Sequence, residues 1–407
     1  MSQQEILKDS KSEKIFIGSY CNNADLDQFD CDYEIWTIKG SNAEMGYATH
    51  NAFRYFGKFP PPIAKRFISE LHDPKKGPVI DPMVGSGTTL VEAKLLGREA
   101  IGLDVNPLSV LISKVKTTNV VSDQVVDEIN RYENWLKINK HRKNKFKDLI
   151  PNDKYMDHWF YPSVQLELAT LKAFLQTIKN QDIKDLFTVA LAGIVRECSR
   201  ASKNLGRMFI DPSIKPVGVT PLLKKRIYKI QSGLHELTKQ PKVISLEHDC
   251  MKPFSIKEKT NLVICHPPYF NVYKFSSIFK FEMLWTGFQP YDIRKKEMRE
   301  FFKIGNPRKV TSYVEDLLLS VKNIAELINK GGWFVLMIGD TTIREKRINT
   351  TSLFLEKLKS SNAKLNLIKL IIRVPRYTEA SYAASQRRDG SQVGIKLFDH
   401  IILFKKK

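Results

Sequence analysis

The residues best suited to chemistry are Ile264-Cys265-His266-Pro267-Pro268-Tyr269. The apolar run from Leu262 to Cys265 predicts a buried parallel strand, which the two prolines would end because proline fixes φ and donates no hydrogen bond. In an open α/β sheet, ligands bind outside the carboxyl ends of the strands. A rigid turn there, with carbonyl groups and an aromatic ring, suits a flat amino-bearing group such as a base. The alternative is a plain Pro-Pro turn covered by a packed tyrosine.

A glycine-rich turn between two further predicted strands forms a second candidate site. The strand that ends in Asp81-Pro82 leads through Gly85-Ser86-Gly87-Thr88-Thr89 into a predicted helix, and the next strand ends in Asp104, followed by Asn106-Pro107. This order predicts the front of a nucleotide-binding βαβ unit, in which the terminal acid suits the two hydroxyls of a ribose. The spacing is neither GxGxxG nor GxxxxGK[ST], and no lysine is placed to cradle phosphates. The turn therefore favours a nucleoside without phosphates, such as S-adenosylmethionine.

Composition bounds the partners of these sites. The chain has 407 residues, 42% of them hydrophobic, which is enough core for two to three domains. Lys and Arg outnumber Asp and Glu by 65 to 44, giving a formal charge of +21. Such an excess favours a polyanionic partner, with nucleic acid first and an anionic membrane second. A basic surface without a partner is the alternative.

Other composition signals concern the compartment and metals. No apolar run reaches membrane-spanning length, and residues 1–5 do not look like a signal peptide, so we expect no membrane association. No CxxC pair occurs, which argues against a zinc site and favours reduced thiols in a cytoplasm. The five cysteines are scattered, at Cys21, Cys31, Cys198, Cys250 and Cys265.

Three stretches together resemble the DNA amino-methyltransferases. Residues 81–89 with residues 104–107 resemble the cofactor motif of that family, which is specific. Thr49-His50, Arg54-Tyr55 and Lys58-Phe59 resemble the segment that precedes the cofactor motif in the family. His266-Pro267-Pro268-Tyr269 resembles the catalytic (Asp/Asn/Ser)-Pro-Pro-(Tyr/Phe) motif, but departs from it at the first position. The matches extend from about residue 47 to 110 and from about 243 to 340.

The resemblance implies an α/β fold: a Rossmann-like methyltransferase sheet with helices on both faces and a terminal antiparallel strand pair, plus a largely helical insert. We expect an N-terminal arm at 1–46, the cofactor-binding half at 47–120, the helical insert at 121–240 and the catalytic half at 241–407. Within the last part, residues 313–330 predict a helix stopped by Gly331-Gly332, and residues 367–373 and 399–404 predict the last two strands.

The resemblance also implies the roles of particular residues. The cofactor, S-adenosylmethionine, would be held by the cofactor motif, the segment before it and an acid, Asp249, that would meet the adenine amino group. The full set is Thr49, Asp81, Pro82, Gly85, Ser86, Gly87, Thr88, Thr89, Asp104, Asn106, Pro107 and Asp249. The catalytic set is His266, Pro267, Pro268 and Tyr269.

Methylation of an exocyclic amine explains the catalytic set. The nitrogen lone pair is delocalised into the ring, so the amine is a poor nucleophile. An acceptor at the first position and the carbonyl of Pro267 would take the two amine protons, which steers the nitrogen towards sp³ and aims its lone pair at the sulfonium methyl. Tyr269 would stack on the base after it leaves the duplex. This reaction needs no metal and no covalent intermediate.

His266 decides how far this mechanism applies. A neutral imidazole nitrogen can accept a hydrogen bond, whereas an imidazolium can only donate one, so we expect the rate to fall once the ring is protonated. The alternative is that His266 marks a lost activity. In the family, Ser at this position is typical of N4-cytosine enzymes and Asp or Asn of N6-adenine enzymes. Tyr269-x-Asn271 and residues 281–285 resemble the Ser-Pro-Pro-Tyr group, which slightly favours cytosine N4.

The insert is the predicted DNA-recognition region, because basic residues at helix ends beside an extended loop can hold phosphates and read base edges. The predicted contacts are Arg196, Arg200, Lys203, Arg207, Lys224 and Lys225. A helical lid with solvated charges is the alternative reading of the same residues.

These features together predict a site-specific DNA methyltransferase. It would act on double-stranded DNA in a restriction-modification setting, in the cytoplasm at the nucleoid, with a cognate restriction endonuclease as a further partner. The alternatives are an N6-adenine DNA methyltransferase, an RNA amino-methyltransferase and a DNA-binding protein that has lost catalysis.

Overall fold

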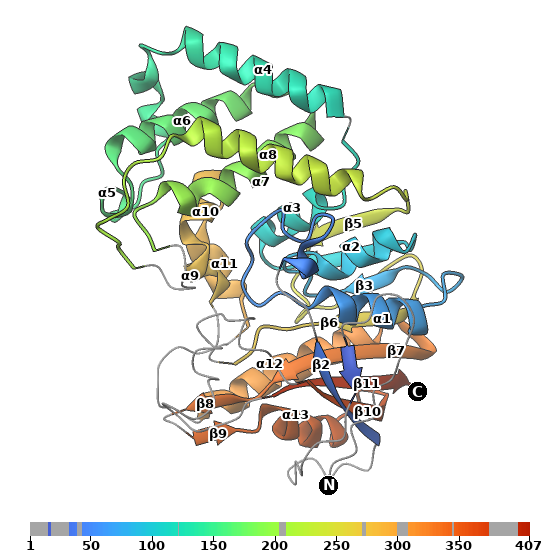
Figure 1. Ribbon diagram of the computed structural model, residues 1–407. Coiled ribbons are helices and arrows are strands. Elements are labelled where there is room, and N and C mark those ends of the chain that lie inside the picture. The colour runs from blue at the N-terminus through green and yellow to red at the C-terminus, as the bar shows by residue number, and fades with distance from the viewer. Residues whose placement is uncertain are drawn as a thin grey trace.

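A nine-stranded sheet organises the protein (Figure 1). The computed structural model describes residues 15–17, 32–38, 43–120, 122–202, 209–270, 274–298, 308–343, 346–373 and 398–407. The strand order is β1-β2-β10-β11-β7-β6-β3-β4-β5. These strands are β1 (Ile15–Ile17), β2 (Asp32–Ile38), β3 (Val79–Asp81), β4 (Ala100–Asp104), β5 (Val243–Glu247), β6 (Thr260–Cys265), β7 (Ile328–Gly339), β10 (Leu365–Arg373) and β11 (Asp399–Lys406). A separate antiparallel pair joins β8 (Thr341–Ile343) to β9 (Lys346–Ile348).

The order of the strands reverses between β3 and β6, and α/β sheets have a ligand-binding crevice outside the carboxyl ends of the strands at such a point. Strands β5, β4, β3, β6 and β7 run parallel to one another. From β3 the chain moves outward to β4 and β5, then returns to β6 on the other side of β3. Such a reversal is a topological switch point, where α/β sheets bind ligands. Both predicted motifs follow the two strands at this point, β3 and β6.

The far side of the sheet carries the predicted terminal antiparallel pair. Strand β11 pairs antiparallel with both β10 and β7, with Ile371 opposite Ile401 and Ile401 opposite Met337. The predicted Rossmann-like α/β class is therefore confirmed. One detail differs: the helix predicted over 313–330 ends at Ala325, and β7 already begins at Ile328 and runs through Gly331-Gly332.

The predicted N-terminal arm contributes two strands of this sheet, β1 and β2, which the sequence did not lead us to expect. Strand β2 pairs parallel with β10. Ile35 packs into the hydrophobic cluster on one face of the sheet, while Trp36 and Ile38 pack into the cluster on the other. A strand buried on both faces lacks the alternation of polar and apolar residues that marks a half-buried strand. The acidic residues before and within β2 further obscured its apolar pattern in the sequence.

Helices cover both faces of the sheet. On one face lie α1 (Pro61–Leu71) and α2 (Thr88–Leu95), whose Phe67 and Leu90 pack with Ile264 of β6. On the other lie α12 (Arg308–Ala325) and α13 (Thr350–Lys359), whose Leu317 and Phe354 share a cluster with residues of β6, β7 and β11. Helix α3 (Pro107–Val115) begins directly after β4.

A separate helical layer lies beyond β5, the strand at one edge of the sheet (Figure 1). It contains α4 (Ser122–Ile138), η2 (Lys143–Leu149), α5 (Met156–Trp159), α6 (Pro162–Gln176), α7 (Gln181–Cys198) and α8 (Val219–His235). Three helices from the predicted catalytic half join its hydrophobic core: α9 (Phe275–Ile278), α10 (Lys280–Thr286) and α11 (Pro290–Lys296). The layer is thus built from two distant stretches of the chain. None of the helices described here is both long and apolar enough to cross a bilayer.

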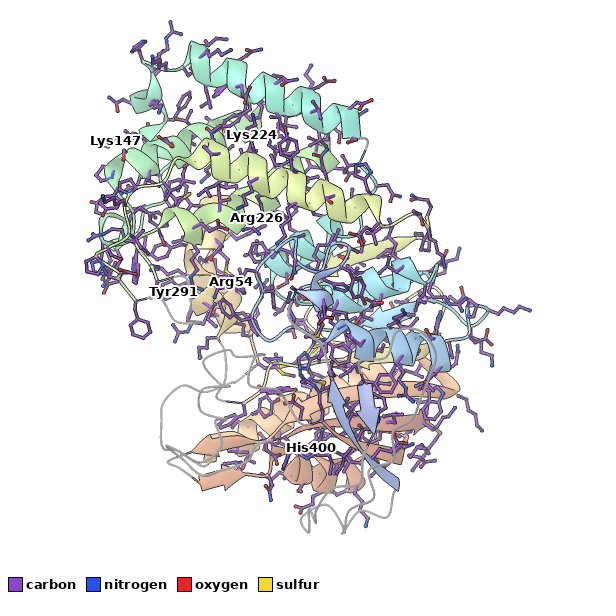
Figure 2. The ribbon with its side chains drawn as sticks, in the orientation of Figure 1. Arg54, Lys147, Lys224, Arg226, Tyr291 and His400 are labelled. Atoms are coloured by element: carbon purple, nitrogen blue, oxygen red, sulfur yellow. The ribbon has the colours of Figure 1, made fainter. Side chains whose placement is uncertain are left out.

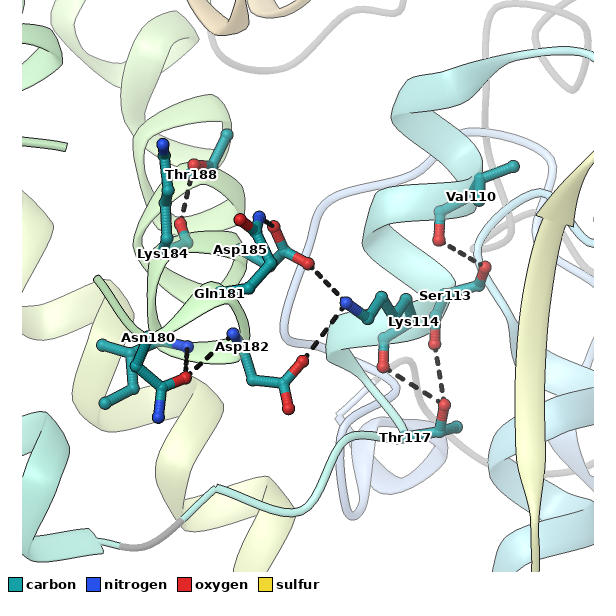
Figure 3. A network of polar contacts seen from close by, with 11 residues as sticks. Val110, Ser113, Lys114, Thr117, Asn180, Gln181, Asp182, Lys184, Asp185 and Thr188 are labelled. Carbon is teal, nitrogen blue, oxygen red and sulfur yellow. Dashed lines mark hydrogen bonds and ion pairs between the residues drawn. The ribbon is translucent and has the colours of Figure 1, made fainter. Parts of the chain in front are cut away.

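Ion pairs fasten this helical layer to α3 (Figure 3). The Lys114 ammonium lies 2.7 Å from the Asp185 carboxylate and 3.2 Å from that of Asp182. Burial disfavours its charge, but the hydrogen bonds to the two acids outweigh this and raise the pKa of Lys114. Asn180 caps the first turn of α7 by accepting hydrogen bonds from the N–H groups of Asp182 and Ile183. These contacts hold α7 against α3, which begins at the cofactor motif.

Candidate active site

The glycine turn after β3 is closed by the acid that ends β4. The N–H of Gly85 donates to one oxygen of the Asp104 carboxylate at 2.9 Å, and the N–H of Asn106 donates to the other at 2.8 Å. Gly85 and Gly87 have φ of +47° and +79°, a region that favours glycine. At Gly87 a Cβ would also lie 2.8 Å from the Cβ of Ser113, so α2 could not approach α3 as closely with any other residue.

Two carboxylates lie at neighbouring strand ends beside this turn. Burial raises the pKa of Asp81 to about 7, although the N–H of Met83 donates to its carboxylate at 3.1 Å. Burial likewise raises the pKa of Asp104 to about 6, against the hydrogen bonds from Asn106 and Gly85. Carboxylates destabilised in this way would be stabilised by a cationic ligand.

The residues present fit S-adenosylmethionine, a nucleoside with a sulfonium and an ammonium group. Its two positive charges match the acid-lined turn, and its lack of phosphates matches a turn whose residues 85–89 include no lysine. Asn106, next to Asp104, has a buried Nδ2 with no hydrogen-bond partner, so a ligand acceptor would satisfy it. The other predicted turn residues, Pro82, Ser86, Thr88, Thr89 and Pro107, lie between β3 and the start of α3, and the Ser86 and Thr88 hydroxyls are 3.3 Å apart.

Thr49 is placed behind the turn. Its side chain is fully buried, and its hydroxyl donates to the Lys116 carbonyl at 2.8 Å. The Lys116 ammonium in turn donates to the Ser86 carbonyl at 2.6 Å, so both residues support the turn from inside the protein. Burial and the charge of Lys58 lower the pKa of Lys116 well below its usual range.

A buried acid on α2, Glu92, completes this support and was not predicted from the sequence. It accepts hydrogen bonds from the hydroxyl of Tyr47 and, at 2.7 Å, from Nε2 of His50. Burial raises the pKa of Glu92 to about 7 and lowers that of His50 well below its usual range, so the ring donates as a neutral imidazole. The signal that could have found Glu92 is a charged residue in a helix that is buried on all sides.

The predicted catalytic motif leaves β6 next to the glycine turn, because β6 and β3 pair through Val263 and Ile80. The ring of His266 stands edge-on to that of Tyr269, with centroids 5.2 Å apart, and lies 5.5 Å from the Phe59 ring. Because neighbouring strands are about 5 Å apart, the two motifs face the same crevice.

The two proline carbonyls of the motif differ in their hydrogen bonds, and the thiol of the preceding Cys265 is buried. The hydroxyl of Tyr313 donates to the Pro268 carbonyl at 2.8 Å, while no donor from the described parts of the chain reaches the carbonyl of Pro267. The carbonyl of Pro267 therefore suits a substrate amine better than that of Pro268. Burial raises the pKa of the Cys265 thiol well above its usual range, which excludes Cys265 as a nucleophile at neutral pH.

Asp249 lies at the same edge of the sheet, beyond β5. The N–H of its neighbour His248 donates to the Asp104 carbonyl at 2.9 Å, which joins this segment to the end of β4. The Asp249 carboxylate accepts from the N–H of Met251 at 3.0 Å and is only partly buried. Among the described residues, the ring of His248 packs against Phe254 and contacts the Lys252 carbonyl, and no hydrogen bond joins it to the crevice.

Tyr55, from the segment before α1, joins the cofactor turn to the chain that follows the catalytic motif. A Cβ on Gly85 would lie 3.4 Å from the Tyr55 hydroxyl. That hydroxyl lies 3.0 Å from the Ser109 hydroxyl on α3, and the ring stacks on Phe275 with centroids 5.3 Å apart. Neither aromatic was singled out as a site residue, because aromatics at this spacing also fit core packing.

The structure describes four of the six predicted DNA contacts of the helical layer, and these four differ in exposure. Arg196 is only 7% exposed, with its guanidinium over the ring of Phe56. Arg200 lies over Tyr161, and Lys224 pairs with Glu133 on the outer side of the layer (Figure 2). Lys225 is exposed on α8. Lys203, Arg207 and Asn271 lie outside the described residues.

Comparison with known proteins identifies the relationship. Residues 8–115 match a family model described as DNA methylase, of the N6/N4 type. The chain is 28% identical over 271 residues to the Type II methyltransferase M.MvaI of Kocuria varians, covering 60% of each chain. Over part of its length, this chain is similar to DNA methylases of the N6/N4 type. The Type II methyltransferase M.BsoBI of Geobacillus stearothermophilus is 25% identical over 291 residues, covering 62% of this chain and 55% of its own length.

The match to the DNA amino-methyltransferases is partial in length. The chain spans somewhat more than half the length of these two relatives. Among solved structures, TrmN from Thermus thermophilus aligns with 86% of this chain and 50% of its own, at 11% identity and a TM-score of 0.32. The DNA methylase match includes the segment before α1, the glycine turn and the end of β4, which are the elements that form the cofactor side of the crevice.

Proposed function

We propose that this protein transfers a methyl group from S-adenosylmethionine to an exocyclic amine of a base in double-stranded DNA. The observation that carries the proposal is the placement of two motifs at one topological switch point. The acid-lined glycine turn follows β3, and His266-Pro267-Pro268-Tyr269 follows the adjacent strand β6. The kinship with the DNA amino-methyltransferases supports the same reaction class.

Each residue of the crevice has a role in this proposal. Asp81 and Asp104 face the positive charges and the ribose of the cofactor, and the residues from Gly85 to Thr89 approach it through their backbone. When bound, S-adenosylmethionine supplies an electrophilic methyl group on a sulfonium. His266, as the neutral imidazole, and the carbonyl of Pro267 would accept hydrogen bonds from the two amine hydrogens and thereby fix the direction of the nitrogen lone pair. As the N–C bond forms, the S–C bond of the cofactor breaks, the thioether leaves, and one amine proton is released to solvent. Tyr269 holds the ring of the base by stacking.

The target base and the setting are finer parts of the proposal. We favour cytosine N4, because the residues around Tyr269 and the 281–285 segment resemble the Ser-Pro-Pro-Tyr group, with adenine N6 as the alternative. The relatives are named Type II methyltransferases, which supports a restriction-modification setting with a cognate endonuclease. Lys224, Lys225 and Arg200 are proposed to contact DNA phosphates, whereas the buried Arg196 is suited to positioning the 53–56 segment.

The test is mass spectrometry of nucleosides after incubation of the protein with S-adenosylmethionine carrying a labelled methyl group. Duplex DNA and transfer RNA are offered in parallel, and sequencing of the methylated DNA maps the site. We expect labelled N4-methylcytosine from DNA, no label in RNA, and loss of labelling in Asp104→Ala. Labelled N6-methyladenine would change the base, label only in RNA would replace the substrate class, and no transfer despite cofactor binding would refute the activity.

A further inference from the structure

Helix α11 carries an aromatic side chain whose position packing does not explain. Tyr291 is 74% exposed, although the other apolar residues of this short segment, Pro290, Ile293 and Met298, are buried. Figure 2 shows Tyr291 at the side of the molecule where the helical layer meets the carboxyl edge of the sheet. A ring left in water on an otherwise anchored helix contributes little to folding and is accessible to a partner.

The carboxyl end of α11 contacts the end of β5. The Lys296 ammonium lies 3.1 Å from the carboxylate of Glu247, at the end of β5. Glu297 accepts hydrogen bonds from the N–H and the hydroxyl of Ser276, at 2.7 and 2.6 Å, which fastens α11 to α9, the helix that follows the catalytic motif. Glu297 is also close enough to Asp104 to add to the effect of burial in raising its pKa.

The length of α11 sets how far Tyr291 stands from this contact. Tyr291 lies five positions before Lys296, which is about 8 Å along a helix. This rise is roughly the thickness of two stacked base pairs. Arg294 and Lys295 are exposed on the same helix, where Lys295 also pairs with the exposed Asp292 at 3.4 Å, so two cations lie within about one turn of the ring. An exposed ring flanked by cations is the combination that binds unstacked bases beside phosphates.

We propose that Tyr291 enters the DNA duplex beside the target base and stacks on the bases left exposed when the target base turns into the crevice. Arg294 and Lys295 hold the adjoining phosphates. The inference rests on the proposed DNA methylation, because it assigns a task that only a duplex substrate requires. Taking a base out of the stack is costly, and a ring that replaces the lost stacking offsets part of that cost.

Methylation kinetics test this role on the mapped site. Tyr291→Ala should lower kcat/KM on the intact duplex about 10- to 100-fold, since aromatic stacking on one base is worth that much in affinity. On a duplex whose target base faces an abasic position, the loss should shrink to about threefold or less, because the base is then easier to extract. Tyr291→Phe keeps the ring and should restore activity, whereas Tyr291→Leu should not.

Tyr228 on α8 provides the matched control, as an exposed tyrosine that is also flanked by cations. Tyr228→Ala should change kcat/KM by about twofold or less on both duplexes. Equal activity of Tyr291→Ala and the parent on the intact duplex would overturn the proposal. So would a loss that the abasic duplex does not relieve.

A fluorescence measurement separates this inference from the proposed function. In Tyr291→Trp, the emission of the new indole should be quenched more strongly by duplex DNA with an abasic position than by the intact duplex, whether or not methyl transfer occurs. Quenching without methyl transfer would leave the DNA contact standing and refute the enzyme. Methyl transfer without quenching would leave the enzyme standing and refute the role of Tyr291.

Discussion

Single residues at the crevice carry the chemistry through their protonation. In the proposed mechanism, His266 accepts a hydrogen bond from the amine only as a neutral imidazole. The buried Asp81 and Asp104 have pKa values raised to about 7 and about 6, so a cationic ligand would stabilise their ionised forms. Protonation is therefore expected to affect both cofactor binding and amine activation, and substitutions at each residue separate the two effects.

The first prediction concerns His266. At saturating cofactor and DNA, kcat of the parent should fall at acid pH, because the imidazolium can no longer accept a hydrogen bond. His266→Asn and His266→Ser retain an acceptor that does not titrate, so their kcat should be flat over the same range. The measurement is a pH–rate profile of the three proteins. A parent profile without an acid limb would show that His266 does not act as the acceptor.

The second prediction concerns Asp81. Its pKa is raised above that of the unfolded chain, so the folded state holds the proton more tightly; the associated stability is present at low pH and is lost as pH rises through about 7. In the absence of cofactor, Asp81→Asn should therefore be more stable than the parent at pH 8, by up to about 4 kcal/mol, and should bind the cofactor more weakly.

Urea unfolding at pH 5 and pH 8 and calorimetry with S-adenosylmethionine measure both effects. Asp292→Asn is the control, because its side chain is 68% exposed and its pH dependence should match that of the parent. An Asp81→Asn variant that is destabilised equally at both pH values would contradict the prediction that burial destabilises the ionised Asp81 carboxylate.

At the scale of elements, a buried ion pair joins β10 to β11 on the far side of the sheet. Arg373 at the end of β10 and Asp399 at the start of β11 are 4% and 3% exposed, with 2.5 Å between guanidinium and carboxylate. Glu34 of β2 and Lys369 of β10 also pair, but both side chains remain accessible to water. The two pairs lie on the same strand and differ mainly in burial.

The third prediction compares these pairs. Arg373→Ala should destabilise the protein by about 3–5 kcal/mol, because it removes the guanidinium that pairs with the buried Asp399 carboxylate. Lys369→Ala, which breaks the more exposed pair, should cost about 1 kcal/mol or less. Chemical unfolding of the two variants gives both values. Similar losses for the two would mean that burial does not distinguish them.

At the scale of the whole molecule, charge and architecture point to the same partner. The chain carries a formal charge of +21, and both α8 and α11 expose cations. Contacts such as Lys114 with Asp182 and Asp185 tie that layer to the helix that begins at the cofactor motif, so DNA held by the layer would be positioned relative to the cofactor (Figure 3).

The fourth prediction is a strong salt dependence of DNA binding. If six or more phosphates are neutralised, the affinity for duplex DNA should fall about 10³-fold or more between about 50 and 200 mM salt, through release of counterions. Affinity for S-adenosylmethionine, which carries no phosphate, should change little over the same range. Fluorescence anisotropy with labelled duplex and calorimetry with the cofactor check the two. A salt-independent DNA affinity would contradict a phosphate-dominated interface.

The sequence by itself determined the two motifs, the parallel α/β sheet and its terminal antiparallel pair, because these depend on local signals: apolar runs, Gly85 and Gly87 at a turn, and prolines after a strand. Only the tertiary structure decided which side chains meet. Strand β2 is buried on both faces, and α9–α11 leave the predicted catalytic half to join the helical layer. Glu92 of α2 and Lys116, just after α3, lie close enough beneath the turn to influence each other's pKa. Contacts between residues far apart in the chain depend on packing, which no local pattern encodes. Hence Arg196, basic in the sequence, lies buried, while Tyr291, unremarked there, faces solvent at the edge of the crevice.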